Sequence, residues 1–425
     1  MNMNLAIEMP GHTEDPTPRT TDVRPVPRIS IHAFCESPEF TATIEIATGD
    51  RRMARAHVNI HHGKITAATE FYQSTATPNL IIIETRLIGA QLDAALDAFA
   101  EVCDASTKVI VVGYVNDVDV YRGLNNRGIS EYLVGPVDEM AMIQTISNLY
   151  ADRTSQFGRA IAFIGGKGGA GSSMVAHNVA WAIAGHFDND VMVADLDLAF
   201  GTAGLDFNQD PTQGIVEALG APERLDDVFL DRLLSRCSDH LSLLAAPASL
   251  DWTYDLDERA VDQVIDVARN GVPAVVLDLP HVWTSWVKKT LLTADEIVLT
   301  VEPDLANLRN AKNIVDLLRQ ERPTDAPPRL VVNKIGLAKR PEINVEDFCA
   351  GLDLPWVATI PFDAKLFGTA ANNGQMIAEA DPDSAVAESF GQIAHLVTGR
   401  GQVKRQKPAG KLGQLMASLR GAKNA

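Results

Sequence analysis

Cysteine is scarce in this chain, and its four cysteines, Cys35, Cys103, Cys237 and Cys349, form no CxxC pair. This spacing argues against a zinc site or a disulfide framework and is typical of a protein in a reducing cytosol. The sequence also lacks any run of about 18 apolar residues, so it predicts no membrane-spanning helix. Residues 1–20 lack a basic start followed by an apolar stretch. We therefore expect no secretory signal and a cytoplasmic location.

Acidic residues outnumber basic residues over most of the chain. The formal net charge is −18, which disfavours nonspecific binding to nucleic acid. Residues 400–425 reverse this balance, with seven Lys or Arg residues and no acidic ones. Within them, residues 411–419 place three leucines and a methionine on one helical face. This segment is expected to be a weak membrane-surface helix, a docking helix for a partner, or a solvated basic tail.

The hydrophobic pattern divides the chain into two α/β series. Residues 1–27 are polar and Pro-rich and predict a disordered leader. Residues 28–150 alternate apolar runs with helical stretches, as in about five βα units on a parallel sheet. We interpret 151–158 as a linker, 159–398 as a second α/β series with a mostly parallel sheet, and 399–425 as the basic tail. The expected strands are Ile29–Cys35, Leu80–Ile83, Lys108–Val112 and Tyr132–Val134 in the first series, and Ala160–Ile164, Val191–Ala194, Leu241–Leu244, Ala274–Leu277, Glu296–Val301, Leu330–Val332 and Trp356–Ile360 in the second.

A glycine-rich loop follows the first strand of the second series and precedes a helix predicted over Met174–Ala184. Its residues are Gly166, Lys167, Gly168, Gly169, Ala170, Gly171, Ser172 and Ser173. Glycines between a strand and a helix let backbone N–H groups converge on phosphate oxygens, and the helix N-terminus adds a positive dipole end. We therefore predict that this whole loop binds ATP, with the hydroxyl of Ser173 as a ligand of Mg²⁺.

One position departs from an ordinary P-loop. The pattern GxxxxGK[ST] has a lysine before the metal-binding residue, and Ser172 stands there instead. Backbone binding of phosphate survives this loss, whereas charge stabilisation of a transferring phosphoryl group survives less easily. The sequence therefore predicts a weak ATPase, with hydrolysis that is slow or dependent on a partner.

The segment from Lys167 to Ala184, KGGAGSSMVAHNVAWAIA, resembles the MinD/ParA family of deviant Walker ATPases, whose pattern is roughly KGGxGKTTxxxNLAxxLA. The resemblance implies a P-loop NTPase domain that forms a homodimer with ATP. It also implies a catalytic role for Lys167, which in that family reaches across the dimer to the phosphates of the partner's nucleotide.

Acidic residues at two later strand ends match the same family. Asp195 and Asp197 follow the strand 191–194, and side chains at such strand ends face the crevice where ligands bind. The resemblance makes Asp197 the residue that positions the attacking water, while Asp195 could simply cap the next turn. Asp278 ends the run AVVLD before Leu279-Pro280, which reads as Walker B and predicts a carboxylate that holds the Mg²⁺ shell through water.

Two further matches concern the base of the nucleotide. Asn333 lies in VVNK, and Pro361 lies in IPFD, each after a predicted strand. In the family, an Asn at this position hydrogen-bonds adenine and the backbone of the IPxD element lines the base pocket. The resemblance therefore adds Asn333 and Pro361 to the expected ATP-binding residues.

Residues 28–150 resemble a response-regulator receiver, which has a flavodoxin-like fold, but phosphotransfer residues are missing. Glu84 stands where the acceptor Asp should end the third strand, Gly113 replaces the Ser or Thr after the fourth, and Gly135 replaces the Lys before Pro136. The resemblance implies a pseudo-receiver used for docking or dimerisation. The alternative is an α/β domain with no receiver ancestry.

A receiver-like domain in front of a MinD/ParA-type ATPase resembles the CpaE/TadZ proteins of Flp (Tad, type IVb) pilus assembly, as does the segment Leu241–Asp251. The resemblance implies a dimerising localisation factor that marks where the pilus secretion machine assembles. It further implies polar placement peripheral to the inner membrane, partners such as the secretion ATPase, and no specific nucleic acid.

Two other functions stay open at this point. One is a ParA-like partitioning ATPase acting on DNA or protein cargo, although the acidic charge argues against DNA. The other is a ligase or reductase of the same P-loop class, and reductase members need a cysteine pair for an iron–sulfur cluster. Cys237 and Cys349 stand alone in the sequence.

Overall fold

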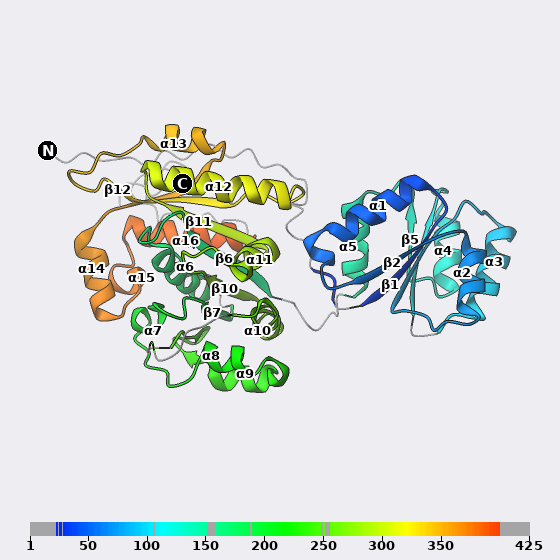
Figure 1. Ribbon diagram of the computed structural model, residues 1–425, viewed down its shortest axis with the longest axis horizontal. Helices are drawn as coiled ribbons and strands as arrows, with labels where there is room; N and C mark the ends of the chain where they lie inside the picture. The colour runs from blue at the N-terminus through cyan, green and yellow to red at the C-terminus, as the bar shows by residue number, and fades with distance from the viewer. Residues whose placement is uncertain are drawn as a thin grey trace, which may run out of the picture.

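The computed structural model of the protein describes residues 23, 25–27, 29–104, 107–150, 158–187, 189–247, 250 and 256–399. The predicted leader, linker and basic tail lie largely outside these residues. The described residues form two domains, each built on its own sheet (Figure 1). Val23 and Val26, within the stretch predicted as leader, are buried against the first domain. In the described part of the chain, no helix is long and apolar enough to cross a membrane.

The N-terminal domain has a five-stranded parallel sheet in the order β2-β1-β3-β4-β5, which is the flavodoxin-like order. This confirms the predicted fold class. Its elements are β1 (Ser30–Cys35), α1 (Pro38–Gly49), η2 (Arg51–Met53), β2 (His57–His62), α2 (Ile65–Tyr72), β3 (Leu80–Glu84), α3 (Ala90–Ala100), β4 (Lys108–Gly113), α4 (Val118–Asn126), β5 (Glu131–Val134) and α5 (Glu139–Leu149).

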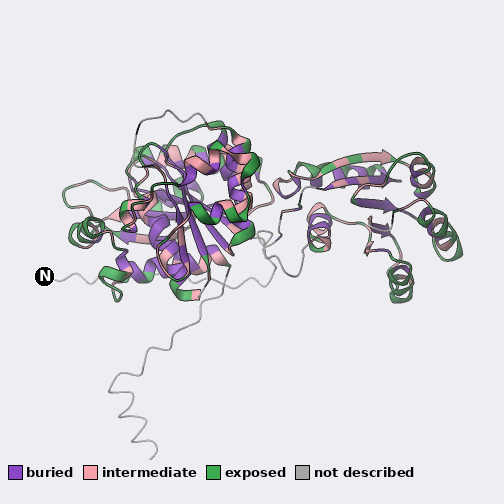
Figure 2. Ribbon diagram, turned by 90° about the horizontal axis from the view of Figure 1, so that it is seen from below, coloured by how far each residue is buried: buried purple, intermediate pink, exposed green. Residues whose placement is uncertain are grey.

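Position in the sheet explains which strands of this domain show an apolar pattern. Every residue of the central strand β3 is buried, because α1 and α5 cover one face and α2, α3 and α4 the other. The edge strand β2 instead alternates exposed and half-buried residues. The sequence pattern did not predict β2 for this reason. Figure 2 shows buried residues following the strands in both domains.

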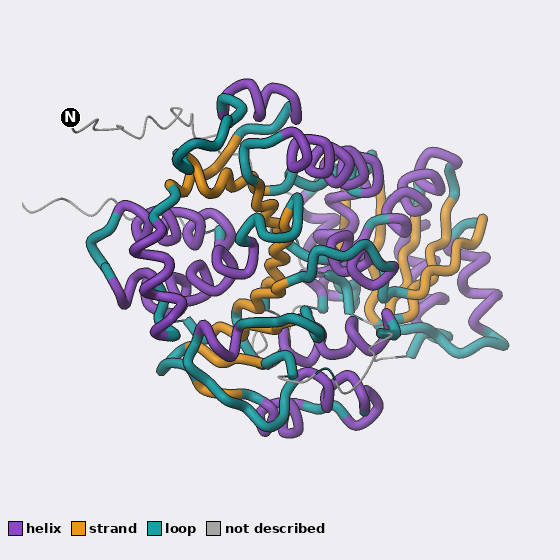
Figure 3. Tube along the Cα trace, turned by 60° about the vertical axis from the view of Figure 1, so that its left-hand side comes forward, coloured by secondary structure: helices purple, strands orange, loops and turns teal. Residues whose placement is uncertain are grey.

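The C-terminal domain has an eight-stranded sheet in the order β13-β12-β11-β6-β10-β7-β9-β8, parallel except for β8. Helices cover both faces (Figure 3). Its elements are β6 (Arg159–Gly165), α6 (Ser172–Phe187), β7 (Val191–Asp195), α7 (Ala203–Asp206), α8 (Ile215–Gly220), η3 (Pro222–Arg224), α9 (Asp227–Leu233), β8 (Ser235–Arg236), β9 (Leu241–Leu244), α10 (Glu258–Gly271), β10 (Ala274–Asp278), α11 (Ser285–Thr293), β11 (Glu296–Val301), α12 (Leu305–Glu321), β12 (Arg329–Ile335), α13 (Val345–Leu352), β13 (Trp356–Pro361), α14 (Ala364–Asn373), α15 (Ile377–Ala380) and α16 (Ala385–Thr398).

The strand order brings the predicted site residues together. Strand β10 lies between β6 and β7, and Asp278 pairs in register with Asp195 of β7. The glycine-rich loop leaves the end of β6 beside them and leads into α6. In open α/β sheets, the crevice at the carboxyl ends of such strands is where ligands bind.

Candidate nucleotide-binding site

The glycine-rich loop has the backbone shape that a phosphate cradle needs. Gly169 and Gly171 have φ of +83° and +87°, a region that side chains rarely adopt. The N–H of Gly166 donates to Thr300 O at 2.8 Å, which fixes the loop to β11. Helix α6 begins at Ser172, two residues before the predicted start, so the N-terminal amides of the helix belong to the loop itself.

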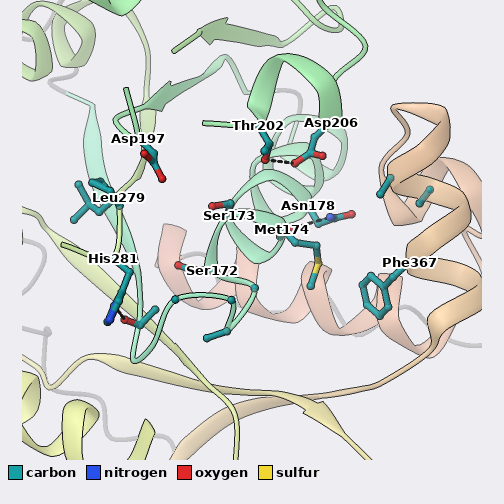
Figure 4. Close-up of a pocket in the computed structure, with 18 of the residues that line it drawn as sticks. Ser172, Ser173, Met174, Asn178, Asp197, Thr202, Asp206, Leu279, His281 and Phe367 are labelled. Atoms are coloured by element: carbon teal, nitrogen blue, oxygen red, sulfur yellow. Dashed lines mark hydrogen bonds between the residues drawn. The ribbon is translucent and has the colours of Figure 1, made fainter. Parts of the chain in front are cut away.

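A cavity of about 440 Å³ opens over this loop. Figure 4 shows its walls, with the loop and α6 on one side, Asp197 and His281 on another, and Phe367 opposite. Seven of the eight predicted loop residues, Lys167 to Ser173, line it, and Gly166 does not. Met376 and Phe367 give the far end an apolar wall from α14 and the segment before α15. Cavities that combine an apolar wall with convergent polar groups are typical ligand sites.

Lys167, to which the resemblance gave a role across a dimer, lies at the mouth of this cavity. Its ammonium is 3.0 Å from the carboxylate of Asp304, the N-cap residue of α12, and its side chain is 40% exposed. Asp304 also accepts from Asn307 N at 2.8 Å, and these bonds outweigh burial and lower the pKa of Asp304. The ion pair with Asp304 therefore holds the lysine side chain at the surface.

Two of the predicted aspartates, Asp195 and Asp197, lie close in the chain but have different surroundings. Asp197 lines the cavity, and its carboxylate accepts from Phe200 N at 3.1 Å. Asp195 is buried and braces the following loop by accepting from the N–H groups of Asp197 and Ala203, at 3.2 and 3.1 Å. Burial, and secondly the charge of Asp278, raise the pKa of Asp195 to about 7. Asp195 thus supports the loop that presents Asp197.

His177 is a member of the site that the sequence analysis missed. It lies on α6, fully buried, with Nδ1 2.8 Å from Asp206 and Nε2 3.3 Å from Asp278. Burial alone would lower the pKa of His177, but the hydrogen bond to Asp206 and the charges of both aspartates raise it to about 10. The signal in the sequence was one ionisable residue among small apolar residues, in VAHNVA. The buried side chain of His177 therefore links Asp278 at the end of β10 to Asp206 of α7.

Replacing His177 by glutamine should destabilise the C-terminal domain in a pH-dependent way. Because the folded-state pKa lies above the ordinary value of 6.5, the stabilisation is complete below pH 6.5 and is lost as the pH rises towards 10. We expect the free energy of unfolding of the variant to be about 3 kcal/mol below that of the wild type at pH 6. This difference should become smaller at pH 9.5. Urea unfolding followed by tryptophan fluorescence measures this, since all five tryptophans lie between residues 159 and 398.

The matched control is His240→Gln. His240 pairs with Asp190 at 2.9 Å, but both side chains are exposed. Its loss should cost under about 1 kcal/mol. If the difference in unfolding free energy between His177→Gln and the wild type stays constant from pH 6 to 9.5, His177 does not form a charged pair with the aspartates.

Asn333 and Pro361 do not line the cavity. Asn333 is buried, its amide donates to Ala170 O at 2.8 Å, and its Oδ1 accepts from Lys334 N at 2.8 Å. Pro361 ends β13 and is exposed. Asn333 therefore holds the glycine-rich loop to β12, and the predicted contacts of both residues with adenine stay predictions.

The residues present fit a Mg²⁺–nucleotide. Asp278 Oδ1 is buried and has no hydrogen-bond partner among the described residues, so a carboxylate oxygen is left for a water or metal ligand. The hydroxyl-bearing Ser173 lines the cavity. Across the part of the chain that the structure describes, no three His, Cys, Asp or Glu side chains are grouped to bind a metal. A magnesium ion held by few protein ligands together with phosphate oxygens matches this arrangement.

The corresponding site in the N-terminal domain is closed by its own side chains. Glu84 is fully buried and accepts four hydrogen bonds: from Glu36 N at 2.7 Å, Ser37 N at 2.8 Å, Ser37 Oγ at 2.6 Å and Tyr114 Oη at 2.6 Å. Burial would raise the pKa of Glu84, but these four bonds lower it. The carboxylate is therefore a fixed structural acceptor, and the interpretation of this domain as a pseudo-receiver stays a prediction.

Comparison with known proteins gives relatives for both halves of this architecture. No protein-family model matches the chain. The septum site-determining protein MinD of Bacillus subtilis is 26% identical over 257 residues, covering 57% of this chain and 90% of that protein. The MinD of Pyrococcus horikoshii, solved in complex with Mg-ADP, is 21% identical with a TM-score of 0.50, and covers 56% of this chain and 95% of that one. The pilus assembly protein CpaE of Caulobacter crescentus is 46% identical, with a TM-score of 0.30, and covers 30% of this chain and 98% of that one.

The fold and the lysine-first loop define a P-loop protein of the MinD/ParA superfamily. The relationship to CpaE rests on sequence identity, which is 46% over nearly the whole of the solved Caulobacter chain. The chain belongs to the CpaE family within that superfamily.

Proposed function

We propose that this protein is an ATP-binding localisation or assembly factor for Flp (Tad, type IVb) pilus or related secretion machinery, which dimerises with nucleotide and hydrolyses it slowly. The observation that carries the proposal is the combination of retained and replaced residues in the glycine-rich loop. Its backbone cradle and Lys167 are retained, while the second lysine is replaced by Ser172. Such a site binds nucleotide well and turns it over poorly, which suits a positional switch.

Exposed apolar side chains around the cavity mouth support dimerisation. Phe200, Trp283 and Leu305 are all more than half exposed, and we call them the rim residues. Each follows a residue of the site in the chain: Phe200 follows Asp197, Trp283 follows the cavity-lining His281, and Leu305 follows the Asp304 that pairs with Lys167. Exposed apolar side chains grouped in this way indicate an interface. A second copy of the chain that covers them would also bring two copies of Lys167 together.

The pilus role rests on the family. The CpaE relatives are named as pilus assembly proteins, and we extend that role to this chain. Partners would then be components of the pilus or secretion machinery, such as its secretion ATPase, with the protein acting in the cytoplasm at a pole or against the inner membrane. The acidic net charge of −18 favours protein partners over DNA.

Size-exclusion chromatography with light scattering tests the switch. With ATP and Mg²⁺ the full chain should form a dimer, whereas Trp283→Glu should stay monomeric because a charge cannot be buried unpaired in an apolar interface. We expect the variant to bind ATP within about threefold of the wild type, a difference under about 0.7 kcal/mol. Val228→Glu is the matched control, since Val228 is also more than half exposed but lies on α9. Absence of both nucleotide binding and a dimer would refute the switch.

The alternative of ParA-like partitioning has its own test. It requires a surface on the C-terminal domain that binds DNA, and such binding weakens steeply with added salt. Salt-sensitive binding of duplex DNA by the ATP-bound dimer would favour partitioning over the pilus role.

A further inference from the structure

A cluster of buried ion pairs joins the two domains. We call it the arginine clasp: Asp50, Arg51 and Arg52 of the N-terminal domain, and Asp295, Arg322 and Asp325 of the C-terminal domain. It lies at the start of β11, where Asp295 also accepts from Ala160 N at 2.9 Å. The glycine-rich loop leaves the opposite end of the same sheet. The clasp and the nucleotide site are therefore at opposite edges.

Asp325 is the centre of the clasp. Its carboxylate accepts from Arg51 Nε at 2.6 Å and Arg322 Nε at 2.7 Å, and it also pairs with Arg52. Burial opposes ionisation, but Arg51 and Arg322 above all lower the pKa of Asp325 to about 2. Asp50 completes the arrangement by accepting from Arg52 Nη1 at 2.9 Å and Thr324 Oγ1 at 3.1 Å. Side chains this buried and mutually bonded hold their elements in one geometry.

Two helices connect the nucleotide site with the clasp. Helix α11 begins just after the cavity-lining His281 and ends at Thr293, whose carbonyl accepts from Arg51 Nη1 at 3.3 Å. Helix α12 begins at the N-cap Asp304, which pairs with Lys167, and ends next to Arg322. At 1.5 Å per residue these helices span about 13 and 26 Å. Arg322 Nη1 also donates to Leu291 O at 2.7 Å, so the two helix ends are tied to each other.

The N-terminal domain thus contacts the C-terminal end of α11 directly, and it reaches the C-terminal end of α12 through Asp325, which also binds Arg322. Figure 1 shows the two domains side by side at this end of the sheet. Cations are favoured at helix C-termini, and Arg51 and Arg322 occupy those positions on α11 and α12. A displacement of either helix along its axis alters the distances to Asp325 and Asp295. A rigid helix end beside a set of directional ion pairs is a physical means of coupling two distant sites.

We propose that the arginine clasp couples nucleotide binding at the C-terminal domain to the position of the pseudo-receiver, through α11 and α12. This inference rests on the nucleotide binding proposed above. Binding of nucleotide moves the loops at the start of these helices, and the clasp opens or tightens in response. The pseudo-receiver is then the output surface of the ATPase domain, without any chemistry of its own.

Hydrogen–deuterium exchange of the full chain tests this, with ATP and Mg²⁺ as the probe. The reporter is segment 50–56, which carries Asp50, Arg51 and Arg52 of the clasp. Its amides form local hydrogen bonds, among them Met53 N to Asp50 O at 2.9 Å and Ala56 N to Met53 O at 2.8 Å. We expect ATP to slow exchange at 166–173 and to change the exchange rate of 50–56 at least threefold. In Arg51→Met the response at 166–173 should persist and that at 50–56 should disappear.

Linkage adds a second, independent measurement. Because coupling between sites is reciprocal, Arg51→Met must change ATP affinity by a similar factor. If ATP speeds exchange at 50–56, the closed clasp opposes ATP binding, and the variant should bind ATP more tightly than the wild type. If ATP slows exchange there, the closed clasp favours ATP binding, and the variant should bind ATP more weakly. Thr324→Val removes only the hydroxyl that Asp50 accepts from and should shift affinity less, in the same direction. The Thr324→Val variant replaces Arg51→Met in the affinity measurement if Arg51→Met does not fold.

Arg127→Met is the matched control, an arginine of the same domain that pairs with Asp93 at 3.5 Å and with Asp97, all at the surface. It should behave as the wild type in both measurements. Protection at 166–173 without any change at 50–56, or an Arg51→Met affinity equal to that of the control, would overturn the coupling. No response at 166–173 would refute nucleotide binding itself.

Discussion

Gly171→Ala is expected to lower ATP affinity at least about 100-fold, which corresponds to about 2.7 kcal/mol or more. Gly171 has φ of +87°, and a Cβ there would lie 2.5 Å from Asn333 Nδ2. That amide is buried and donates to Ala170 O at 2.8 Å. The methyl group must therefore either displace Asn333 from the loop or flatten the loop itself. Both changes would misdirect the backbone N–H groups that are predicted to hold phosphate. Isothermal titration with ATP and Mg²⁺ measures the loss.

Gly169→Ala separates backbone strain from the collision. Gly169 has nearly the same φ, +83°, but a Cβ there would meet nothing within 4 Å. A left-handed alanine costs about 1–2 kcal/mol, so we expect about a 5- to 30-fold loss of affinity. Adding Asn333→Ala to Gly171→Ala should restore part of the affinity by removing the collision. Equal losses at the two glycines, or no rescue, would show that Asn333 does not brace the loop.

Ser172→Lys is expected to raise kcat for ATP hydrolysis roughly 100-fold or more, because a cation then faces the phosphoryl group as charge develops. ATP affinity should change by less than about threefold, since backbone groups supply most of the ground-state binding. Ser172 lines the cavity, and its hydroxyl is buried without a hydrogen-bond partner in the described structure. Its replacement therefore breaks no side-chain hydrogen bond among the described residues. Steady-state phosphate release, with nucleotide affinity measured in parallel, gives both quantities.

Ser172→Met is the control for side-chain length, since it fills similar space without charge. It should leave kcat near the wild-type value. If the wild type hydrolyses ATP as fast as Ser172→Lys does, the proposal that Ser172 slows turnover is wrong. A similar gain in Ser172→Met would attribute the effect to packing and not to charge.

The sequence predicted those parts of the fold whose strands are buried on both faces. The runs at β3, β6 and β10 are continuous in apolar residues because helices cover both sides of each sheet. Strand β2 escaped prediction because it is an edge strand of mostly polar residues. Its place is set by pairing with β1, which depends on the rest of the fold.

The candidate site was predicted where local sequence determines local shape. The loop from Gly166 to Ser173 is a strand–turn–helix unit of contiguous residues, so its pattern is visible in the chain. His177 was missed because its role depends on Asp206 and Asp278, 29 and more residues away. The arginine clasp was missed for the same reason, since it pairs side chains of two domains. Charge on Arg51 or Asp325 alone does not distinguish a buried pair from a solvated surface.

The buried carboxylate of Glu84 bears on how this chain could change over evolutionary time. Its four donors come from the turn before α1 and from Tyr114 beyond β4, at distances set by the longer side chain of glutamate. An aspartate at this position would be one methylene shorter and would leave buried donors unsatisfied, which costs stability. A change from glutamate to aspartate at position 84 is therefore selected against on its own, because the neighbouring donors would have to change with it.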